Sequence, residues 1–233
     1  MERGDRCNAQ GGLLATVPVP ANYVVPNSGN NNSTALLMPD GATVEENQPF
    51  TRCAKGGLGT TLVTFPDKSI YGPGPYRSRR QWPVGARWGD PFGEFKSGAI
   101  HHVMKIELWA KQYYYCCSPR WPATQVDGGA NHTTYGGTNP YLKPGSLLAL
   151  PPSFKVRQMT TTPGKILAQA FIDYGAYVVD DTALNAWTLG TEQGPSGSVV
   201  NEFKALYGFT MSGPAWGSPF MNDIQIPFRR SRS

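Results

Sequence analysis

The chain of 233 residues combines 27 glycines, 21 prolines and 12% aromatic residues with only 16% charged residues, which disfavours a disordered protein and favours one all-β or loop-rich domain. The whole net charge of +5 comes from arginines at residues 77–87 and 229–232, because the rest of the chain is slightly acidic, so we expect no nucleic-acid partner. No apolar run is long enough to cross a bilayer, so we expect no membrane span.

The first third of the chain predicts an arm followed by short strands. Residues 1–35 are polar and rich in Gly, Pro and Asn, and we expect them to form an extended N-terminal arm. The segment ALLMPDGATV, residues 35–44, predicts two strands around a Pro-Asp-Gly turn, because Pro presets φ and Gly accepts a positive φ. The β-branched run at residues 60–65 predicts another strand.

Residues 100–110 form the clearest strand pattern. Alternation places His102 on the apolar face, together with Ile100, Met104, Ile106 and Leu108. A histidine on such a face is more often a hydrogen-bonded structural residue than a catalyst. It is also the residue type whose pKa best suits proton transfer, so His102 is a catalytic candidate.

The second half predicts one clear helix between strands. Residues 146–150 predict a buried strand, and residues 162–174 predict a helix, with Pro in the first turn and Gly175 after its end. Residues 176–181 predict a strand that ends in two carboxylates, and residues 201–207 predict a short helix before a Pro-rich coil.

These elements predict a mainly β fold, an antiparallel β-sandwich of the jelly-roll type with one or two short helices. Residues 36–228 would form a single β-rich domain, and residues 229–233 would form a basic tail.

The cysteines and histidines show no metal-ligand spacing. Cys116 and Cys117 are adjacent, which is not a CxxC pair, and no His cluster is apparent beside them or beside Cys7 and Cys53. We therefore expect no metal, and disulfides if the chain is exported. The sequence also lacks a P-loop and a dinucleotide fingerprint, so we expect no cofactor.

Three residues are candidates for catalysis. Asp127 precedes Gly128 in a predicted turn, and Asp180 ends a predicted strand. Two separated carboxylates suit glycosidic cleavage, in which one protonates the leaving oxygen and the other acts as nucleophile or activates water. His102 is the alternative acid or base. Asp is also ordinary in turns and at strand ends, where it caps backbone amides.

Flat aromatic side chains near polar groups suit sugar rings, which have C–H faces and hydroxyl edges, although most such rings are core or rim packing. Arg120 could pair with an acidic sugar or, within the chain, with Asp127. The candidate ligand-binding residues are Arg120, Trp121, Tyr135, Tyr174 and Asp181.

Several blocks resemble a family of secreted bacterial proteins without an assigned activity. They are MPDGATVEENQPFTRCAKGG, IHHVMKIELWAK, RWPATQVDGG, TYGGTNPYLKPGSLLALPPS, TPGKILAQAFIDYGAYVVDDT and EQGPSG, and the resemblance spans roughly residues 22–209. The family pattern runs through HALKINLWAK, YRWPAVxADG and LQDYGAYVVDD. The resemblance implies secretion and a polysaccharide-facing role, but no mechanism.

One segment departs from that family. RSRRQWPVGARWGDPF, residues 77–92, stands where the family carries a glycine-rich block resembling GxHGGSGLSALGGxIRLGE. The segment permits codons that, read one base later, give GHGGSGLSALGGAIR. We interpret it as a translation in a shifted frame that is restored near Gly93. The alternative is a divergent loop whose Arg and Trp side chains cover apolar surface.

The sequence therefore predicts a secreted, extracellular protein whose partner is a polysaccharide or other glycan. One hypothesis is a carbohydrate-active enzyme, either a glycoside hydrolase or a lyase. The alternative is a non-catalytic glycan-binding module or a structural module that self-associates into filaments. The sequence alone leaves open whether the chain is an enzyme.

Overall fold

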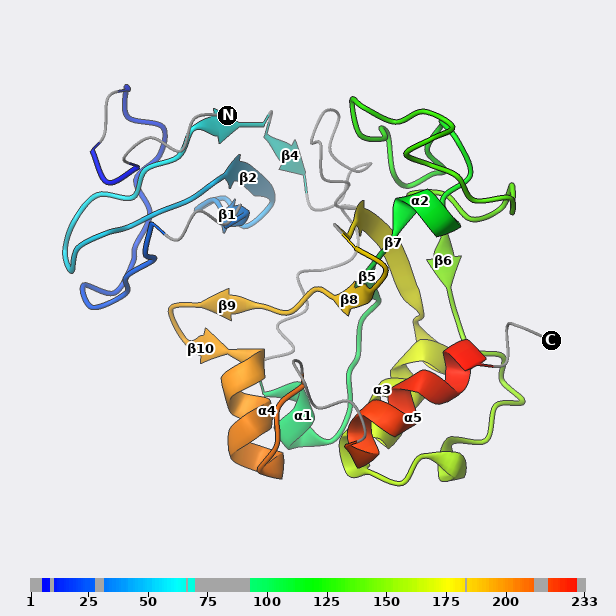
Figure 1. Ribbon diagram of the computed structural model, residues 1–233. Coiled ribbons are helices and arrows are strands. Elements are labelled where there is room, and N and C mark those ends of the chain that lie inside the picture. The colour runs from blue at the N-terminus through cyan, green and yellow to red at the C-terminus, as the bar shows by residue number, and fades with distance from the viewer. Residues whose placement is uncertain are drawn as a thin grey trace.

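The computed structural model describes residues 6–8, 11–27, 32–65, 67–69, 93–182, 184–211 and 218–229. The predicted frame shift at residues 77–92 lies outside these residues, as does the tail after residue 229. Figure 1 shows the N-terminal strands on one side of a central sheet, with most of the helices at one end of that sheet and a single short helix at the other.

The predicted hairpin around the Pro-Asp-Gly turn is confirmed. Strands β1 (Thr34–Leu37) and β2 (Thr43–Gln48) pair antiparallel. The Asp40 carboxylate accepts the backbone N–H of Thr43 at 2.8 Å, and Gly41 has a φ of 66°. Asp40 thus closes the turn, and the positive φ at Gly41 is one that other residues rarely adopt.

Two shorter strands, β3 (Val63–Thr64) and β4 (Lys68–Ser69), also pair antiparallel with β2. β3 is shorter than the predicted strand at residues 60–65, because Thr60 instead forms an isolated bridge with Thr51.

The N-terminal arm is held by a disulfide and a buried arginine. Cys7 and Cys53 are bonded, with Cα atoms 5.5 Å apart, which confirms the expectation of a disulfide. Arg52 donates from one guanidinium nitrogen to the carbonyls of Pro20 at 2.7 Å and Tyr23 at 2.6 Å. The arm is therefore fixed to the N-terminal sheet although it has almost no regular structure of its own.

The central sheet has the strand order β6-β7-β5-β8. Its strands are β5 (Met104–Leu108), β6 (Leu147–Leu148), β7 (Ala176–Asp181) and β8 (Trp187–Leu189). β5 and β7 pair parallel, whereas β6 and β8 pair antiparallel at the two edges.

The helices and remaining strands complete the fold. A two-stranded hairpin joins β8 to the fourth helix. The elements are α1 (Glu94–Ser97), α2 (Ala110–Tyr113), the 3-10 helix η1 (Val156–Gln158), α3 (Thr162–Asp173), β9 (Gln193–Gly194), β10 (Gly197–Ser198), α4 (Val199–Tyr207) and α5 (Pro219–Arg229).

The expected antiparallel β-sandwich is wrong. About 21% of the described residues are helical and about 21% lie in strands, and the sheets that these residues form contain only two to four strands. The central pair β5 and β7 is parallel, and a parallel pair needs a crossover connection, which here contains α3. A period of two in the sequence identifies strands but does not reveal the direction in which they pair.

Helix α3 confirms the helix predicted at residues 162–174, and its N-cap is Thr161. The Thr161 hydroxyl accepts the N–H of Gly164 at 3.0 Å, and Pro163 occupies the first turn. Gly175, with a φ of 72°, ends the helix and leads directly into β7.

The predicted C-terminal coil is also wrong, because α5 lies there. Its start is set by Ser218, whose hydroxyl accepts the N–H of Met221 at 3.1 Å, and by Pro219 in the first position. Pro has no N–H to lose at that position, so the proline that suggested coil is compatible with a helix start.

A buried carboxylate joins α5 to the N-terminus of α3. Asp223 is 1% exposed, and its two oxygens accept the backbone N–H groups of Thr160 and Thr161, both at 2.8 Å. The hydroxyls of both threonines donate to it as well. A Cβ on Gly164 would lie 2.3 Å from an Asp223 oxygen, so this helix start accepts only glycine there.

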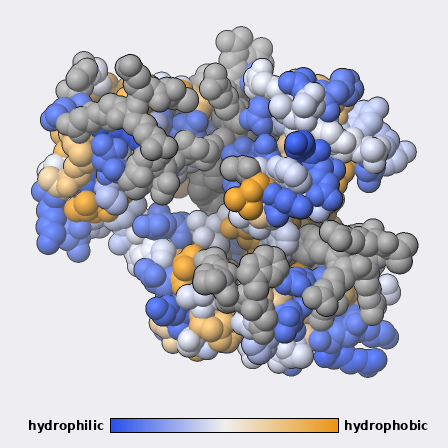
Figure 2. Space-filling view, in the orientation of Figure 1, coloured by the Kyte–Doolittle hydropathy of each residue, from blue (hydrophilic) through white to orange (hydrophobic). Residues whose placement is uncertain are grey.

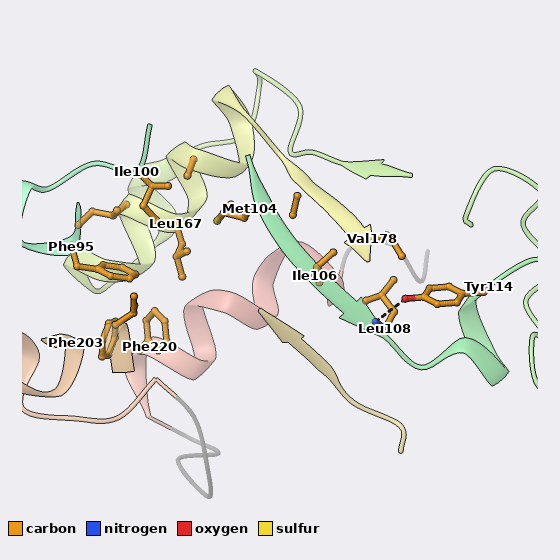
Figure 3. Close-up of a cluster of buried hydrophobic side chains, with 14 of the residues drawn as sticks. Phe95, Ile100, Met104, Ile106, Leu108, Tyr114, Leu167, Val178, Phe203 and Phe220 are labelled. Atoms are coloured by element: carbon orange, nitrogen blue, oxygen red, sulfur yellow. Dashed lines mark hydrogen bonds between the residues drawn. The ribbon is translucent and has the colours of Figure 1, made fainter. Parts of the chain in front are cut away.

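The hydrophobic core lies between the central sheet and the helices, as Figure 3 shows. Alternation in β5 holds as predicted, since Met104, Ile106 and Leu108 are all buried. The centroids of the Phe203 ring of α4 and the Phe220 ring of α5 lie 4.9 Å apart. The strand and both helices therefore share one core.

On the face shown in Figure 2, hydrophobic residues lie in small groups among hydrophilic ones. Among the described residues, every helix is too short or too polar to cross a bilayer.

We expect Asp223→Ala to lower the free energy of unfolding by at least about 3 kcal/mol, because four donors on Thr160 and Thr161 lose a charged acceptor in a buried place. Urea unfolding would measure the loss. Asp173→Ala is the matched control: Asp173 is exposed and accepts only from Gln169 at 2.9 Å, so the change should stay within about 0.5 kcal/mol. Equal losses in the two variants would show that the buried carboxylate does not hold α5 to α3.

Candidate functional site

The carboxyl ends of β5 and β7 meet at the start of α2. Because the two strands are parallel, Asp181 at the end of β7 lies beside the residues that follow β5. Its Oδ1 accepts the backbone N–H of Ala110 at 2.7 Å. Ligands of sheets with parallel strands commonly bind at this edge.

Two buried tyrosines, Tyr114 and Tyr135, form hydrogen bonds that hold the residues at this edge of the sheet. The hydroxyl of Tyr114 accepts the N–H of Leu108 at 3.1 Å, drawn in Figure 3, and donates to the carbonyl of Asp180. The Tyr114 ring packs edge-on against Tyr135, with centroids 5.4 Å apart. The Tyr135 hydroxyl donates to Oδ2 of Asp127 at 2.8 Å. We call Asp127, Asp181, Tyr114 and Tyr135 the carboxylate site.

The surroundings of the carboxylate site raise the pKa values of Asp181 and of both tyrosines. Partial burial raises the pKa of Asp181, and the charge of Asp127 raises it further, whereas the N–H groups of Ala110 and Thr182 lower it. Burial also raises the pKa of the Tyr114 and Tyr135 hydroxyls, with Asp127 adding to the effect on Tyr135, so both remain hydrogen-bond donors. Asp181 is nevertheless exposed, so it combines a raised pKa with access to solvent.

A register shift separates the roles of Asp180 and Asp181. Ile106 pairs with Val178, but Glu107 pairs with Asp180, so β7 contains one extra residue at this point. Asp180 then turns its carboxylate to the N–H of Asp181, at 2.9 Å. The structure thus brings Asp181 within electrostatic reach of Asp127, whereas Asp180 contributes its backbone carbonyl to Tyr114. Bulges of this kind often re-aim side chains beside functional sites.

Two exposed aromatic side chains lie on neighbouring loop segments after α2. Trp121 is 75% exposed and Tyr141 is 74% exposed. Their segments run side by side, because the N–H of Arg120 donates to the carbonyl of Pro144 at 2.8 Å. Arg120 itself is exposed, and among the described residues it forms no ion pair with Asp127. We call Trp121 and Tyr141 the aromatic pair.

His102 lies away from these residues. Its Nδ1 is 2.8 Å from the carbonyl of Val103, and its Nε2 is 3.0 Å from the carboxylate of Glu94 on α1. Met104, two residues later, is the first residue of β5, whereas Asp181 pairs with Leu108 at the other end of that strand. The strand between them spans about 13 Å. His102 therefore joins α1 to the start of β5.

Tyr174 also lies at that far end, because it is followed by Gly175, whose carbonyl accepts the N–H of Met104 at 3.0 Å. Of the residues singled out in the sequence, the structure thus gathers Asp127, Tyr135 and Asp181, and leaves His102 and Tyr174 apart from them.

Two features were missed in the sequence. Tyr114 is the fully buried member of the run Tyr113-Tyr114-Tyr115, and only its tertiary contacts distinguish it from its neighbours. The second feature is the only group of three metal-ligating side chains among the described residues. It joins Cys116 and Cys117 to His132, with ligand atoms within 4.8 Å of one another.

No known protein family, curated protein or solved structure matches the chain. The resemblance to a family of secreted bacterial proteins stays a prediction. A function must therefore be argued from the carboxylate site and its surroundings.

The raised pKa of Asp181 predicts a pH-dependent effect of Asp181→Asn on stability. The folded state binds this proton more tightly than the unfolded state, so wild-type stability should fall as pH rises from the ordinary value of 3.8 through the raised pKa. The variant lacks this loss, and its amide oxygen can still accept from Ala110. In urea unfolding, we expect the free energy of unfolding of Asp181→Asn to rise relative to that of the wild type as the pH goes from acid to neutral. Asp173→Asn is the control, and parallel curves for Asp181→Asn and wild type would contradict the shift.

Proposed function

We propose that this chain is a secreted carbohydrate-active protein that cleaves a polysaccharide at the carboxylate site. The observation that carries the proposal is the exposed Asp181 with a raised pKa beside a second carboxylate, Asp127, at the carboxyl edge of a parallel strand pair. A perturbed acid next to a specific charge partner is characteristic of acid–base sites.

The two carboxylates are suited to different roles. Asp181 keeps a proton to higher pH than an ordinary Asp, so it is the candidate general acid for the leaving oxygen. Asp127, oriented by the Tyr135 hydroxyl, is the candidate base or nucleophile. Tyr114 positions the edge by joining Leu108 to the backbone of Asp180, and its hydroxyl has both bonds satisfied internally.

Two further observations support a sugar substrate and secretion. Trp121 and Tyr141 expose flat faces on adjacent segments of the loop that also carries Asp127, and such faces stack on the C–H faces of sugars. The Cys7–Cys53 disulfide is typical of an oxidising compartment and supports an extracellular location.

We expect Asp181→Asn and Asp127→Asn each to lower the rate of polysaccharide cleavage by at least about 100-fold, since each removes one acid–base partner. New reducing ends or unsaturated products, measured across a panel of acidic and neutral polysaccharides, are the readout. Activity should also decline as pH rises through the raised pKa of Asp181, because the acid must be protonated.

Asp180→Asn is the matched control, and it should change the rate only a few-fold because the Asp180 side chain bonds its own neighbour. If Asp180→Asn were as damaging as Asp181→Asn, the assignment of the acid would be wrong.

A second candidate is glycan binding without cleavage, which the exposure of the aromatic pair favours. Here Trp121→Ala and Tyr141→Ala should each weaken glycan binding about ten-fold in isothermal titration. Tyr174→Ala, an aromatic change at the far end of the sheet, is the control and should leave the affinity unchanged. Binding that depends on the aromatic pair, with no product from any polysaccharide, would favour this candidate over the enzyme. An unchanged affinity in Trp121→Ala and Tyr141→Ala would exclude the pair as the binding surface.

A further inference from the structure

The side chains of Cys116, Cys117 and His132 come together outside the carboxylate site. One ligand atom from each lies within 4.8 Å of the others. Cys116 is buried, whereas Cys117 and His132 are exposed, so the group opens to solvent on one side. We call it the Cys–His cluster.

The fold holds the two parts of the Cys–His cluster together by backbone contacts. Tyr115 and Gly136 form an isolated antiparallel bridge, and the N–H of Gly137 donates to the carbonyl of Tyr114 at 2.9 Å. A Cβ on Gly137 would lie 2.3 Å from the carbonyl oxygen of Tyr113, so only glycine permits this approach. The chain after His132 is therefore pinned to the chain before Cys116.

The turn that carries His132 is also fixed. The Asn131 side-chain oxygen accepts the N–H of Thr133 at 2.8 Å, and the Asn131 carbonyl accepts the N–H of Tyr135 at 2.7 Å. Because Tyr135 is itself buried against Tyr114, the turn has a defined place relative to the cysteines.

Adjacency argues against a stabilising role for a Cys116–Cys117 disulfide. The structure pairs the two sulfurs, but their sequence separation is 1, so a bond between them closes almost no chain. Disulfides stabilise mainly by restricting the unfolded chain, and the effect grows with the length of the closed loop. The Cys7–Cys53 bond, with a separation of 46, has that effect.

We propose that the reduced Cys–His cluster binds a thiophilic divalent cation of the Zn²⁺ type through two thiolates and one imidazole. Cys₂His is a known donor set for Zn²⁺, and three protein ligands leave the fourth position for water or a substrate atom. Both thiols lose their protons on binding, so affinity should rise with pH.

Oxidation of the Cys–His cluster would release the cation. In that step the two thiolates lose two electrons to a disulfide oxidant and form the Cys116–Cys117 bond, and the oxidant takes up the two electrons and two protons from water to become two thiols. A phosphine reverses it: the phosphine takes oxygen from water and becomes the phosphine oxide, and the disulfide gains two electrons and two protons. Cation binding at the Cys–His cluster does not depend on the proposed glycan activity.

The test uses the full-length chain, reduced with a water-soluble phosphine, and titrated with Zn²⁺ against a chromophoric chelator. We expect one equivalent to bind, and Co²⁺ in its place to show a thiolate charge-transfer band. His132→Ala and Cys117→Ser change exposed residues and should each weaken Zn²⁺ binding by at least about 100-fold. His101→Ala, at another exposed histidine, is the matched control and should bind like the wild type.

A double variant, Cys7→Ser with Cys53→Ser, tests whether the other thiols bind the ion, and it should keep one equivalent. Circular dichroism of each variant reports whether the fold is retained. The proposal is overturned if the reduced wild type binds no Zn²⁺, if His132→Ala binds as tightly as His101→Ala, or if the Co²⁺ complex lacks the thiolate band.

Discussion

The parallel pairing of β5 with β7 is the constraint on which the rest of the structure depends. A parallel pair cannot be joined by a tight turn, so the chain must leave β5, cross the sheet and return through α3. The start of α3 is in turn fixed by the buried carboxylate of Asp223, a residue of α5. Through this carboxylate the end of the described chain contributes to the placement of β7, and thus to the edge at which the carboxylate site lies.

The extra residue in β7 decides which aspartate reaches that site. Without the shift between Ile106 and Glu107, the partner of Leu108 would be Asp180 and not Asp181. A single residue inserted into a strand changes which side chains share an edge. Two adjacent aspartates at the end of a strand therefore have different surroundings. The Asp180 carboxylate accepts the backbone N–H of its neighbour, whereas the Asp181 carboxylate experiences the charge of a second carboxylate, Asp127.

Local signals predicted the local structure well. The Pro-Asp-Gly turn, the alternation in β5 and the helix α3 all follow from residues within one turn or strand of each other. The strand direction, the register shift and α5 could not be predicted in this way. Strand direction and register depend on contacts between segments about 70 residues apart, and the Ser218-Pro219 start of α5 lies in a stretch whose prolines suggested coil.

The same distinction explains what could be predicted of the site. Asp127, Tyr135 and Asp181 were found as residue types that suit sugar chemistry, but their grouping depends on β7 and on the loop from Ala110 to Ser146. His102 is a residue type suited to proton transfer, but the structure places it in contact with Glu94 at the other end of β5. The Cys–His cluster could not be predicted from residue spacing, because its histidine follows the cysteines by about 15 residues. The close backbone contact at Gly137 brings the two segments together.

The loop after α2 carries both proposed sites although it has almost no helix or strand. It is held at two buried points. The Tyr114 hydroxyl bonds the backbone of β5 and β7, and the N–H of Gly145 donates to the carbonyl of Val178 at 2.8 Å. A Cβ on Gly145 would lie 1.8 Å from the carbonyl oxygen of Arg120, so only glycine allows the backbone of these two parts of the loop to pack together. Side chains between these points, among them Cys117, Trp121 and His132, can therefore face solvent while their backbone stays fixed to the sheet.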